Sequence, residues 1–432
     1  MTGRSDALAP ARLPAWLGRL ASPALLVFGA NMTRSGFAFV LGLVVARVLG
    51  PEDFGVLATF TAATIWAHNL VGEGFDPGVV RLYARRQAQD TQRAGDILGA
   101  ALVLRLLLLL PMAALFWLLS SFANEEAVGH AIRLAALTAA AASLATLSLA
   151  VLQASERFFA YALLTPLVNA LRLAALPLLW LAGLLTLDAL MWTHALFFAL
   201  GAAVGMFLLR APLRQCRADR ATFVELVRFS RWTALASLCF LLQSYLALPA
   251  LTQWSGLSQA GFYSAAATLL MFIDQLTVAL LTTRLPSTSR ISSTPDLRRY
   301  VGAIAPKLLL TGGALGLLWP AAEWLVTLAY GHDYADAAPV MRWLLPGFIA
   351  TLCSHPLYLV LYAQNRPHGY AVTGIASLLL WCALALWLIP AHGAVGAAMA
   401  GSAARIGQAL LIAVLVWRAL RHPSSPSNRT DP

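Results

Sequence analysis

The chain has 432 residues, of which 59% are hydrophobic and only 11% charged, and its mean hydropathy is +0.72. Since a soluble domain carries about 25% charged residues, this composition excludes an ordinary soluble protein and indicates one built for lipid. The formal net charge is +11, and the positions of the basic residues decide what that charge means.

Apolar runs of about twenty residues without a charge recur along the chain, and each is close to the length of a membrane-spanning helix. Leu, Ala, Val and Ile dominate without the alternation of a transmembrane barrel, and lipid offers no partner to an unpaired backbone group. We therefore predict an all-α membrane protein with about twelve spans. The spans are expected near residues 22–48, 54–75, 96–120, 131–153, 158–184, 186–209, 231–253, 258–283, 304–329, 338–363, 368–389 and 394–418.

Most of the 30 basic residues fall in the tails and in alternate loops, whereas the opposite loops are short and neutral or acidic. Because cytoplasmic loops retain positive charge, we expect a cytoplasmic lead-in (1–20), basic linker (211–230) and tail (420–432). The net charge of +11 then reflects the arrangement of the chain in the membrane, with the basic loops on the cytoplasmic side. It also favours anionic phospholipid headgroups, and the pattern does not indicate a nucleic-acid partner.

Two turns share one plan. "ARVLGPEDFGVLATF" places a polar bridge between Gly50 and Gly55, and "TQWSGLSQAGFYSAAA" does the same between Gly256 and Gly261, 206 residues later. This repeat predicts two pseudo-symmetric six-helix lobes, 21–210 and 231–419. With an even number of spans in each half the repeats are parallel, and transporters of that design bind substrate between their halves.

Five stretches carry a resemblance that covers nearly the whole chain. They are "ARVLGPEDFGVLA", "LVGEGFDPGVVRLYAR", "GLSQAGFYSAAATLL", "LAYGHDYADAAPVMRWLLP" and "AHGAVGAAMAG". In order and spacing they resemble bacterial polysaccharide (O-antigen, Wzx-type) flippases of the multidrug/oligosaccharidyl-lipid/polysaccharide (MOP) exporter superfamily, whose fold is MATE-like.

The resemblance implies alternating access by two lobes that move a polyprenyl-diphosphate-linked oligosaccharide to the outer leaflet of the bacterial inner membrane. It implies a role in surface polysaccharide and lipopolysaccharide biosynthesis beside a polysaccharide polymerase and a chain-length regulator. Relatives often carry a charge in the seventh span, but Thr233–Trp254 has no charged residue, and Gln243 and Ser244 are the polar side chains near its middle. Ion coupling through that span is therefore an open question.

Seven arginines lie outside the predicted cytoplasmic segments, and a charge at this depth usually faces a cavity or a partner. Arg34, with Asn31 on the same helical face, is the first candidate for binding the substrate diphosphate. The remaining candidates for substrate binding are Arg105, Arg172 and Arg405. Simpler roles are expected for the other three: Arg47 and Arg133 snorkel to the outer surface, and Arg342 forms an outer-surface ion pair near Asp336.

Intramembrane acids are fewer. Asp274 and Glu73 are candidates for ion coupling, although an intramembrane carboxylate can instead be protonated or paired with an arginine, and for Asp274 the structural pair is the simpler interpretation. His68 is the counterpart of Asp274 in the first repeat, and Glu323 lies inside the ninth span.

No nucleotide-binding or metalloenzyme motif is present, and four widely spaced cysteines (Cys216, Cys239, Cys353 and Cys382) read as packing residues, so no cofactor or metal is expected. A membrane glycan polymerase or ligase remains an alternative from another class, but it would need a larger outer loop. A multidrug extruder is the alternative from the same superfamily. Its cationic substrates would be repelled by a cavity with four arginines.

Overall fold

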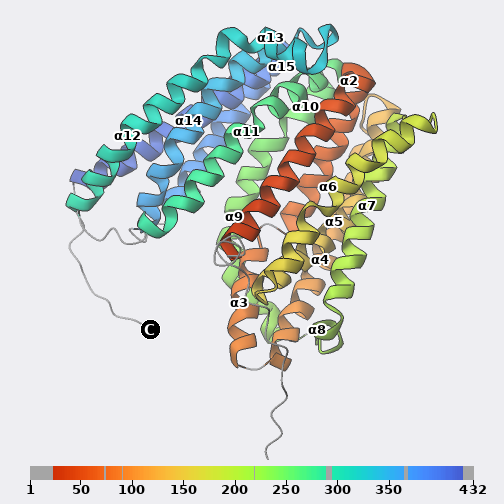
Figure 1. Cartoon of the computed structure of the whole chain (residues 1–432), viewed down its shortest axis with the longest axis vertical. Coiled ribbons are helices and arrows are strands. Elements are labelled where there is room, and N and C mark those ends of the chain that lie inside the picture. Colours follow the sequence, from red (N-terminus) through yellow and green to blue (C-terminus); the bar gives the residue numbers. More distant parts are fainter. Residues whose placement is uncertain are drawn as a thin grey trace, which may run out of the picture.

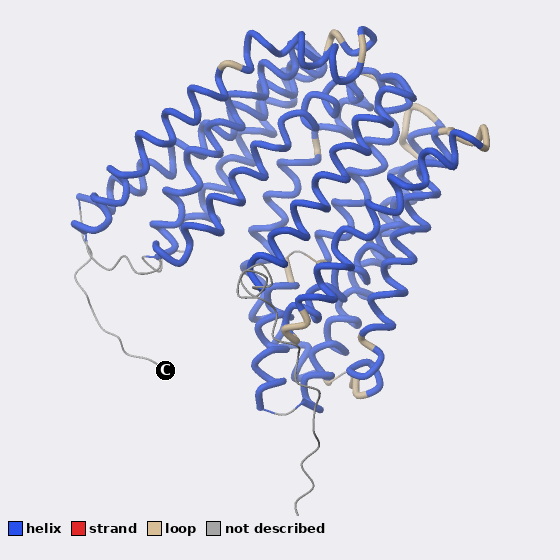
Figure 2. The backbone as a smooth tube through the Cα atoms, viewed as in Figure 1, coloured by secondary structure: helices blue, strands red, loops and turns tan. Residues whose placement is uncertain are grey.

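A computed structural model describes residues 23–72, 74–89, 91–217, 219–288, 294–363 and 368–421, and within these ranges the chain is helical with no strand (Figure 2). The first half contains α2 (Pro23–Val71), α3 (Asp76–Gln89), α4 (Thr91–Ser120), α5 (Glu126–Ala154), α6 (Phe158–Leu181), α7 (Leu187–Leu208) and α8 (Arg210–Arg214). The second half contains α9 (Arg220–Tyr245), α10 (Ala247–Trp254), α11 (Leu257–Thr288), α12 (Thr294–Gly316), α13 (Leu318–Tyr330), the short η1 (His332–Tyr334), α14 (Ala337–Ala363) and α15 (His368–Arg421).

Within the described ranges, eight helices are long and apolar enough to cross a membrane, or nine when α12 and α13, bent by 48°, count as one span. Two of the eight are long enough for two spans each, because α2 runs on for 49 residues and α15 for 54. Dividing those two and adding the 32-residue α11 gives the twelve predicted spans.

Glycines divide the two longest helices. A straight helix of 49 residues would be about 74 Å long, far more than a bilayer is thick. Within α2, Gly50 has φ 77° and ψ 174°, a backbone conformation that glycine adopts without steric cost, and Pro51 follows at a position where a new helix tolerates proline. Gly393, with φ 56°, divides α15 in the same way.

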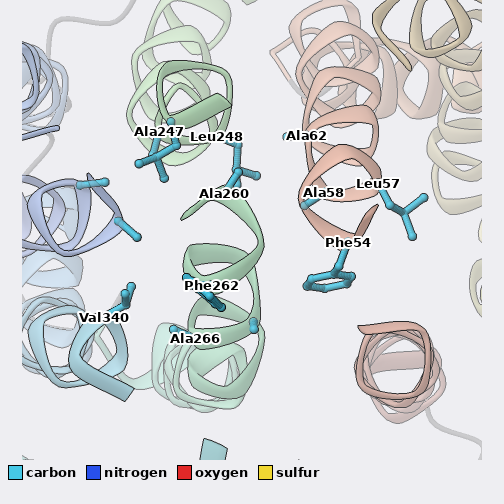
Figure 3. Packing of buried hydrophobic residues seen from close by; sticks show 14 of the residues in the cluster. Phe54, Leu57, Ala58, Ala62, Ala247, Leu248, Ala260, Phe262, Ala266 and Val340 are labelled. Atoms are coloured by element: carbon cyan, nitrogen blue, oxygen red, sulfur yellow. The ribbon is translucent and has the colours of Figure 1, made fainter. Parts of the chain in front are cut away.

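The described helices form two bundles that meet at one end and diverge at the other (Figure 1). We call the upper end in Figure 1 the turn end, because the turns at Gly50, Gly256 and Gly331 lie there, and the lower end the basic end, which carries α3 and α8. A large apolar core joins both halves and includes Phe54 and Ala58 of α2 with Phe262 of α11 (Figure 3).

A second core fills the basic end of the first half. It includes Ile97 and Leu98 of α4 and Leu147 of α5, and Leu226 of α9 is part of it. The second half thus contributes one helix to the packing of the first.

Helix α9 connects the two bundles. It begins at Arg220, inside the segment predicted to be a linker. At the basic end Thr233 donates a hydrogen bond to the Gly74 carbonyl (2.9 Å), and Arg86 of α3 pairs with Glu225 (2.5 Å). Further along α9, Gln243 donates to Ser377 of α15 (2.7 Å).

Candidate functional site

The two halves close tightly at the turn end. A side-chain carbon on Gly55 would fall on the carbonyl oxygen of Leu257, and one on Gly261 would fall on the carbonyl oxygen of Pro51. Only glycine allows two backbones to approach so closely, as in other packed membrane helices. Gly55 and Gly261 are equivalent positions of the sequence repeat, 206 residues apart, and in the structure their two turns pack against each other. We call this contact the glycine seam.

Further polar contacts reinforce the turn end. The Tyr334 hydroxyl donates to the Ala46 carbonyl (2.8 Å), and the Asn124 amide donates to the Gln253 carbonyl (2.9 Å). Both bonds connect the first half with the second.

Below the seam, α2 and α11 remain adjacent as far as Gly42, where a side-chain carbon would touch the Thr268 methyl group at 3.4 Å. Arg34 and Asp274 lie further toward the basic end on these two helices. At 1.5 Å per residue, Arg34 is about 24–26 Å and Asp274 about 20–26 Å along its helix from the residues of the seam. The two charges therefore lie at a similar depth, beyond the point where the halves touch, on helices that diverge (Figure 1).

Arg34 is exposed and belongs to a polar group shared by α2 and α6. The Asn169 amide donates to the Arg34 carbonyl (3.2 Å), and Arg172 donates to the Asn169 side-chain oxygen (3.4 Å). Among the described residues no acid forms an ion pair with Arg34 or Arg172. Asn31 lies on the same helix, where its amide donates to the Val27 carbonyl (3.0 Å).

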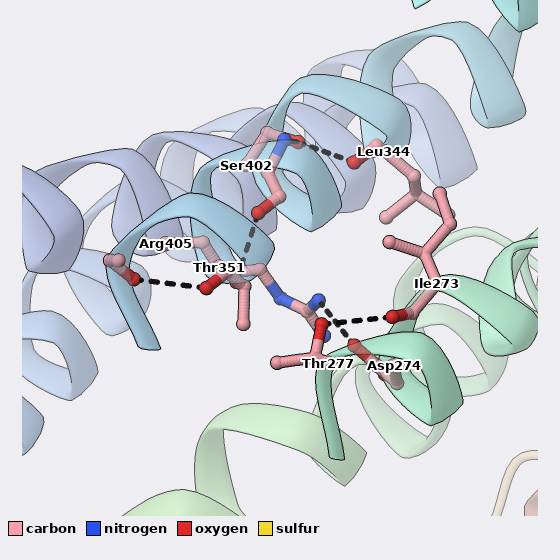
Figure 4. A network of polar contacts seen from close by, with 9 residues as sticks. Ile273, Asp274, Thr277, Leu344, Thr351, Ser402 and Arg405 are labelled. Carbon is pink, nitrogen blue, oxygen red and sulfur yellow. Dashed lines mark hydrogen bonds and ion pairs between the residues drawn. The ribbon is translucent and has the colours of Figure 1, made fainter. Parts of the chain in front are cut away.

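Arg405 differs, because it has an acidic neighbour. Its guanidinium lies 3.9 Å from the carboxylate of Asp274 on α11 and stands over the Phe348 ring at 4.1 Å (Figure 4). The backbone beside it is fixed: Ser402 donates to the Leu344 carbonyl (3.1 Å). Arg405 thus extends toward α11 from α15, which is hydrogen-bonded to α14.

Arg105 lies inside the first half. It is buried, pairs with Asp76 at 2.5 Å and donates through Nε to the Ser143 carbonyl (3.1 Å). Arg105 and Arg34 both lie within electrostatic range of the buried His68, whereas the partners of Arg405 are on α11 and α14. Asp76, the first residue of α3, received no role in the sequence analysis; its position in the "FDPG" stretch after a predicted span was the available signal.

The remaining expectations have mixed outcomes. Arg133 stacks over Trp117 at 6.0 Å, and Arg47 is exposed near the turn end. Arg342 does form an exposed ion pair, but the acid is Glu323 of α13 at 3.5 Å and not Asp336, because the bend between α12 and α13 directs α13 toward α14. Glu73 lies outside the described residues.

His68, the repeat counterpart of Asp274, is buried and hydrogen-bonds the Thr64 carbonyl (2.7 Å). The described ranges contain no group of three or more His, Cys, Asp or Glu side chains placed to hold a metal. Arginine and amide side chains, such as those of Arg34 and Asn31, bind phosphate oxygens well.

Residues 21–292, more than half of the chain, match the family described as polysaccharide biosynthesis protein. The chain belongs to this family. A curated relative named lipid III flippase, from Escherichia coli strain K12, is 21% identical over 418 residues, which cover 92% of this polysaccharide biosynthesis protein and 99% of the relative.

Solved structures show the same fold. An inward-facing multidrug-resistance MATE transporter of the MOP superfamily aligns with a TM-score of 0.76 at 15% identity, covering 93% of this chain and 100% of the other. The lipid II flippase MurJ, in an inward closed conformation, aligns with a TM-score of 0.71 at 14% identity, covering 90% and 87%. The predicted fold class, an all-α membrane protein with a MATE-like arrangement, is confirmed.

Proposed function

We propose that this polysaccharide biosynthesis protein is a flippase. It moves a polyprenyl-diphosphate-linked oligosaccharide across the bacterial inner membrane by alternating access, for surface polysaccharide export. Family membership supports this function, as does the similarity to the E. coli lipid III flippase and to the lipid II flippase MurJ. Both termini face the cytoplasm in this proposal, so the basic end is cytoplasmic and the glycine seam is on the outer side.

The observation that carries the proposal is the exposed Arg34 with Arg172 close by, joined through Asn169 and without an acidic partner among the described residues. Two guanidinium groups without an acidic partner in the described ranges are costly in a membrane unless they face water or an anion. A guanidinium binds phosphate through two parallel hydrogen bonds that a lysine cannot reproduce. We assign Arg34 and Arg172 to the substrate diphosphate, with Asn31 and Asn169 orienting them.

The direction of opening follows from the contacts. The halves are sealed at the glycine seam, whereas Arg34 and Asp274 lie where α2 and α11 diverge. This arrangement receives substrate from the cytoplasmic side. Release to the outside then requires the seam to open.

The experiment uses proteoliposomes that contain a fluorescent prenyl-diphosphate-linked sugar, and it measures the fraction protected from an impermeant quencher. Arg34→Ala should abolish translocation and Arg34→Lys should retain a fraction, while both variants accumulate normally. Arg47→Ala, an exposed arginine of the same helix near the seam, is the matched control and should translocate normally.

The proposed role of Arg34 is wrong if Arg34→Ala translocates at the wild-type rate, or if removing Asp274 as well restores it. The latter would make Arg34 a structural partner of that acid. A lengthened glycan on the same lipid would indicate a polymerase. Export of amphiphilic cations in place of the lipid would indicate a multidrug extruder.

A further inference from the structure

Two intramembrane ion pairs in this chain differ in geometry. Arg105 and Asp76 approach to 2.5 Å, with side-chain exposures of 1% and 17%. Arg405 and Asp274 are 3.9 Å apart, with exposures of 26% and 43%. The first pair is enclosed by protein, while the second is partly exposed.

This difference sets how readily each pair separates. Separating a buried pair leaves an uncompensated charge, which is strongly unfavourable. At 3.9 Å the atoms of the second pair are too far apart for a hydrogen bond, and a partly exposed pair contributes little free energy. Another anion can therefore replace the Asp274 carboxylate at a small cost.

The position of Arg405 makes it available to such an anion. The Phe348 ring at 4.1 Å supports one face of the guanidinium, an arrangement that stabilises the cation, and the Nη1 atom is buried with no hydrogen-bond partner in the described part of the chain. Figure 4 shows the guanidinium directed toward Asp274 and Thr277 of α11. The hydroxyl of Thr277 donates to the Ile273 carbonyl (2.8 Å).

The helix that carries Arg405 does not have to move for such an exchange. Ser377 donates to the Ala404 carbonyl (2.9 Å), and the Gly347 amide donates to the Ser402 hydroxyl (3.1 Å). These bonds hold α15 against itself and α14. Exchange at Arg405 thus does not require a movement of α15.

We propose that Asp274 is a displaceable counter-ion: it occupies Arg405 while the transporter is empty, and a phosphate group of the substrate displaces it. This inference rests on the proposed flippase function and assigns the second half of the diphosphate site. Arg34 and Arg172 bind from the first half, and Arg405 binds from the second. After substrate leaves, Asp274 returns to Arg405 and competes against rebinding.

Binding of farnesyl diphosphate to the purified protein in lipid nanodiscs tests the exchange by titration calorimetry. Asp274→Asn removes the competing charge and should bind the diphosphate about two- to fivefold more tightly, the factor that corresponds to a partly exposed ion pair. Arg405→Ala should bind more weakly than wild type. Asp274→Asn should also translocate the lipid-linked sugar more slowly, because release is slower.

Asp76→Asn is the matched control, since it removes the acid of the enclosed pair. It should lower thermal stability without tightening diphosphate binding. Inorganic pyrophosphate and farnesol are titrated in parallel. Tighter pyrophosphate binding by Asp274→Asn assigns the effect to the phosphates alone, and an effect confined to farnesyl diphosphate shows that the lipid is required.

If Asp274→Asn binds farnesyl diphosphate as well as or more weakly than wild type and has lowered thermal stability, the Arg405–Asp274 pair only stabilises the fold. That result would overturn the inference. Wild-type translocation of the lipid-linked sugar would in that case leave the proposed function standing. If the wild-type protein neither binds farnesyl diphosphate nor translocates the lipid, the proposed function and this inference both fail.

Discussion

Ser258 donates a hydrogen bond to Glu52 across the boundary between the two halves (3.3 Å), and the two residues are 206 positions apart. The same offset separates Gly55 from Gly261, and each of these glycines faces a carbonyl of the opposite segment. A residue that touches its own repeat equivalent lies beside the axis that relates the repeats. The glycine seam is therefore a self-complementary contact at the pseudo-two-fold axis.

A methyl group at the seam should separate the halves. Gly261→Ala places a carbon on the Pro51 carbonyl oxygen, and overpacking of this kind costs about 1–3 kcal/mol. We expect the closed seam to be depopulated. The measurement is the disulfide yield of the Glu52→Cys/Ser258→Cys pair, which should fall when Gly261→Ala is added.

Gly36→Ala in α2 is the control, since a side-chain carbon there meets nothing within 4 Å. It should leave the disulfide yield unchanged. An undiminished yield in Gly261→Ala would show that the seam is not tightly packed.

Much of the fold could be predicted from the sequence, because a membrane imposes length and composition on every span. The turns at Gly50 and Gly256 were recognised from a polar bridge between two glycines, and both have positive φ in the structure. The break between α12 and α13 at Leu317 was not predicted, although Gly316 precedes it and Pro320 lies in the first turn of α13.

The site was less predictable, because a span that is apolar on all sides has no hydrophobic face to show which residues point inward. Arg34 and Arg105 look equivalent in sequence, yet one is exposed and the other is enclosed by Asp76 and Ser143. The decisive partner, Asp76, lies on another helix. Such pairing depends on tertiary packing.

Removing Arg105 should destabilise the protein more than it affects substrate binding. Arg105→Ala leaves Asp76 buried without its cation, a loss of about 3–5 kcal/mol for a buried pair. Monodispersity and the thermal midpoint in detergent measure this loss. Replacing both residues, as Asp76→Leu/Arg105→Met, should recover part of the stability.

Arg34→Ala serves as the comparison for this prediction, because Arg34 is exposed. Its thermal midpoint should stay near the wild-type value. Equal midpoints for Arg34→Ala and Arg105→Ala would contradict a stabilising role for the enclosed pair.

The start of α9 should respond to pH through its capping residue. The Asp219 carboxylate accepts hydrogen bonds from the backbone N–H and the hydroxyl of Thr222 (both 3.0 Å), and these bonds lower its pKa. The folded-state pKa of Asp219 is lower than the unfolded-state pKa of about 3.9. The ionised carboxylate therefore stabilises the helix start at pH values above the unfolded-state pKa, and this stabilisation is lost as the pH falls through the folded-state pKa. The amide protection factor of Thr222 measures it.

Asp219→Ala should reduce that protection at pH 7, because the helix loses its N-cap. Asp219→Asn keeps an acceptor without a titrating charge, so its protection should not depend on pH in this range. Equal protection in the wild-type protein and Asp219→Ala at pH 7 would exclude the capping role.

The topology can be tested with two single cysteines in a variant that lacks the four native ones. Glu125 is exposed in the turn between α4 and α5, and Gln215 is exposed after α8 at the basic end. With the basic end in the cytoplasm, an impermeant maleimide added to intact cells should label Glu125→Cys and leave Gln215→Cys unlabelled until the cells are permeabilised. Labelling of Gln215→Cys alone would invert the orientation, and the glycine seam would then close the cytoplasmic side. Labelling of both from outside would contradict the twelve-span arrangement, because three spans, α5, α6 and α7, lie between the two positions and place them on opposite sides.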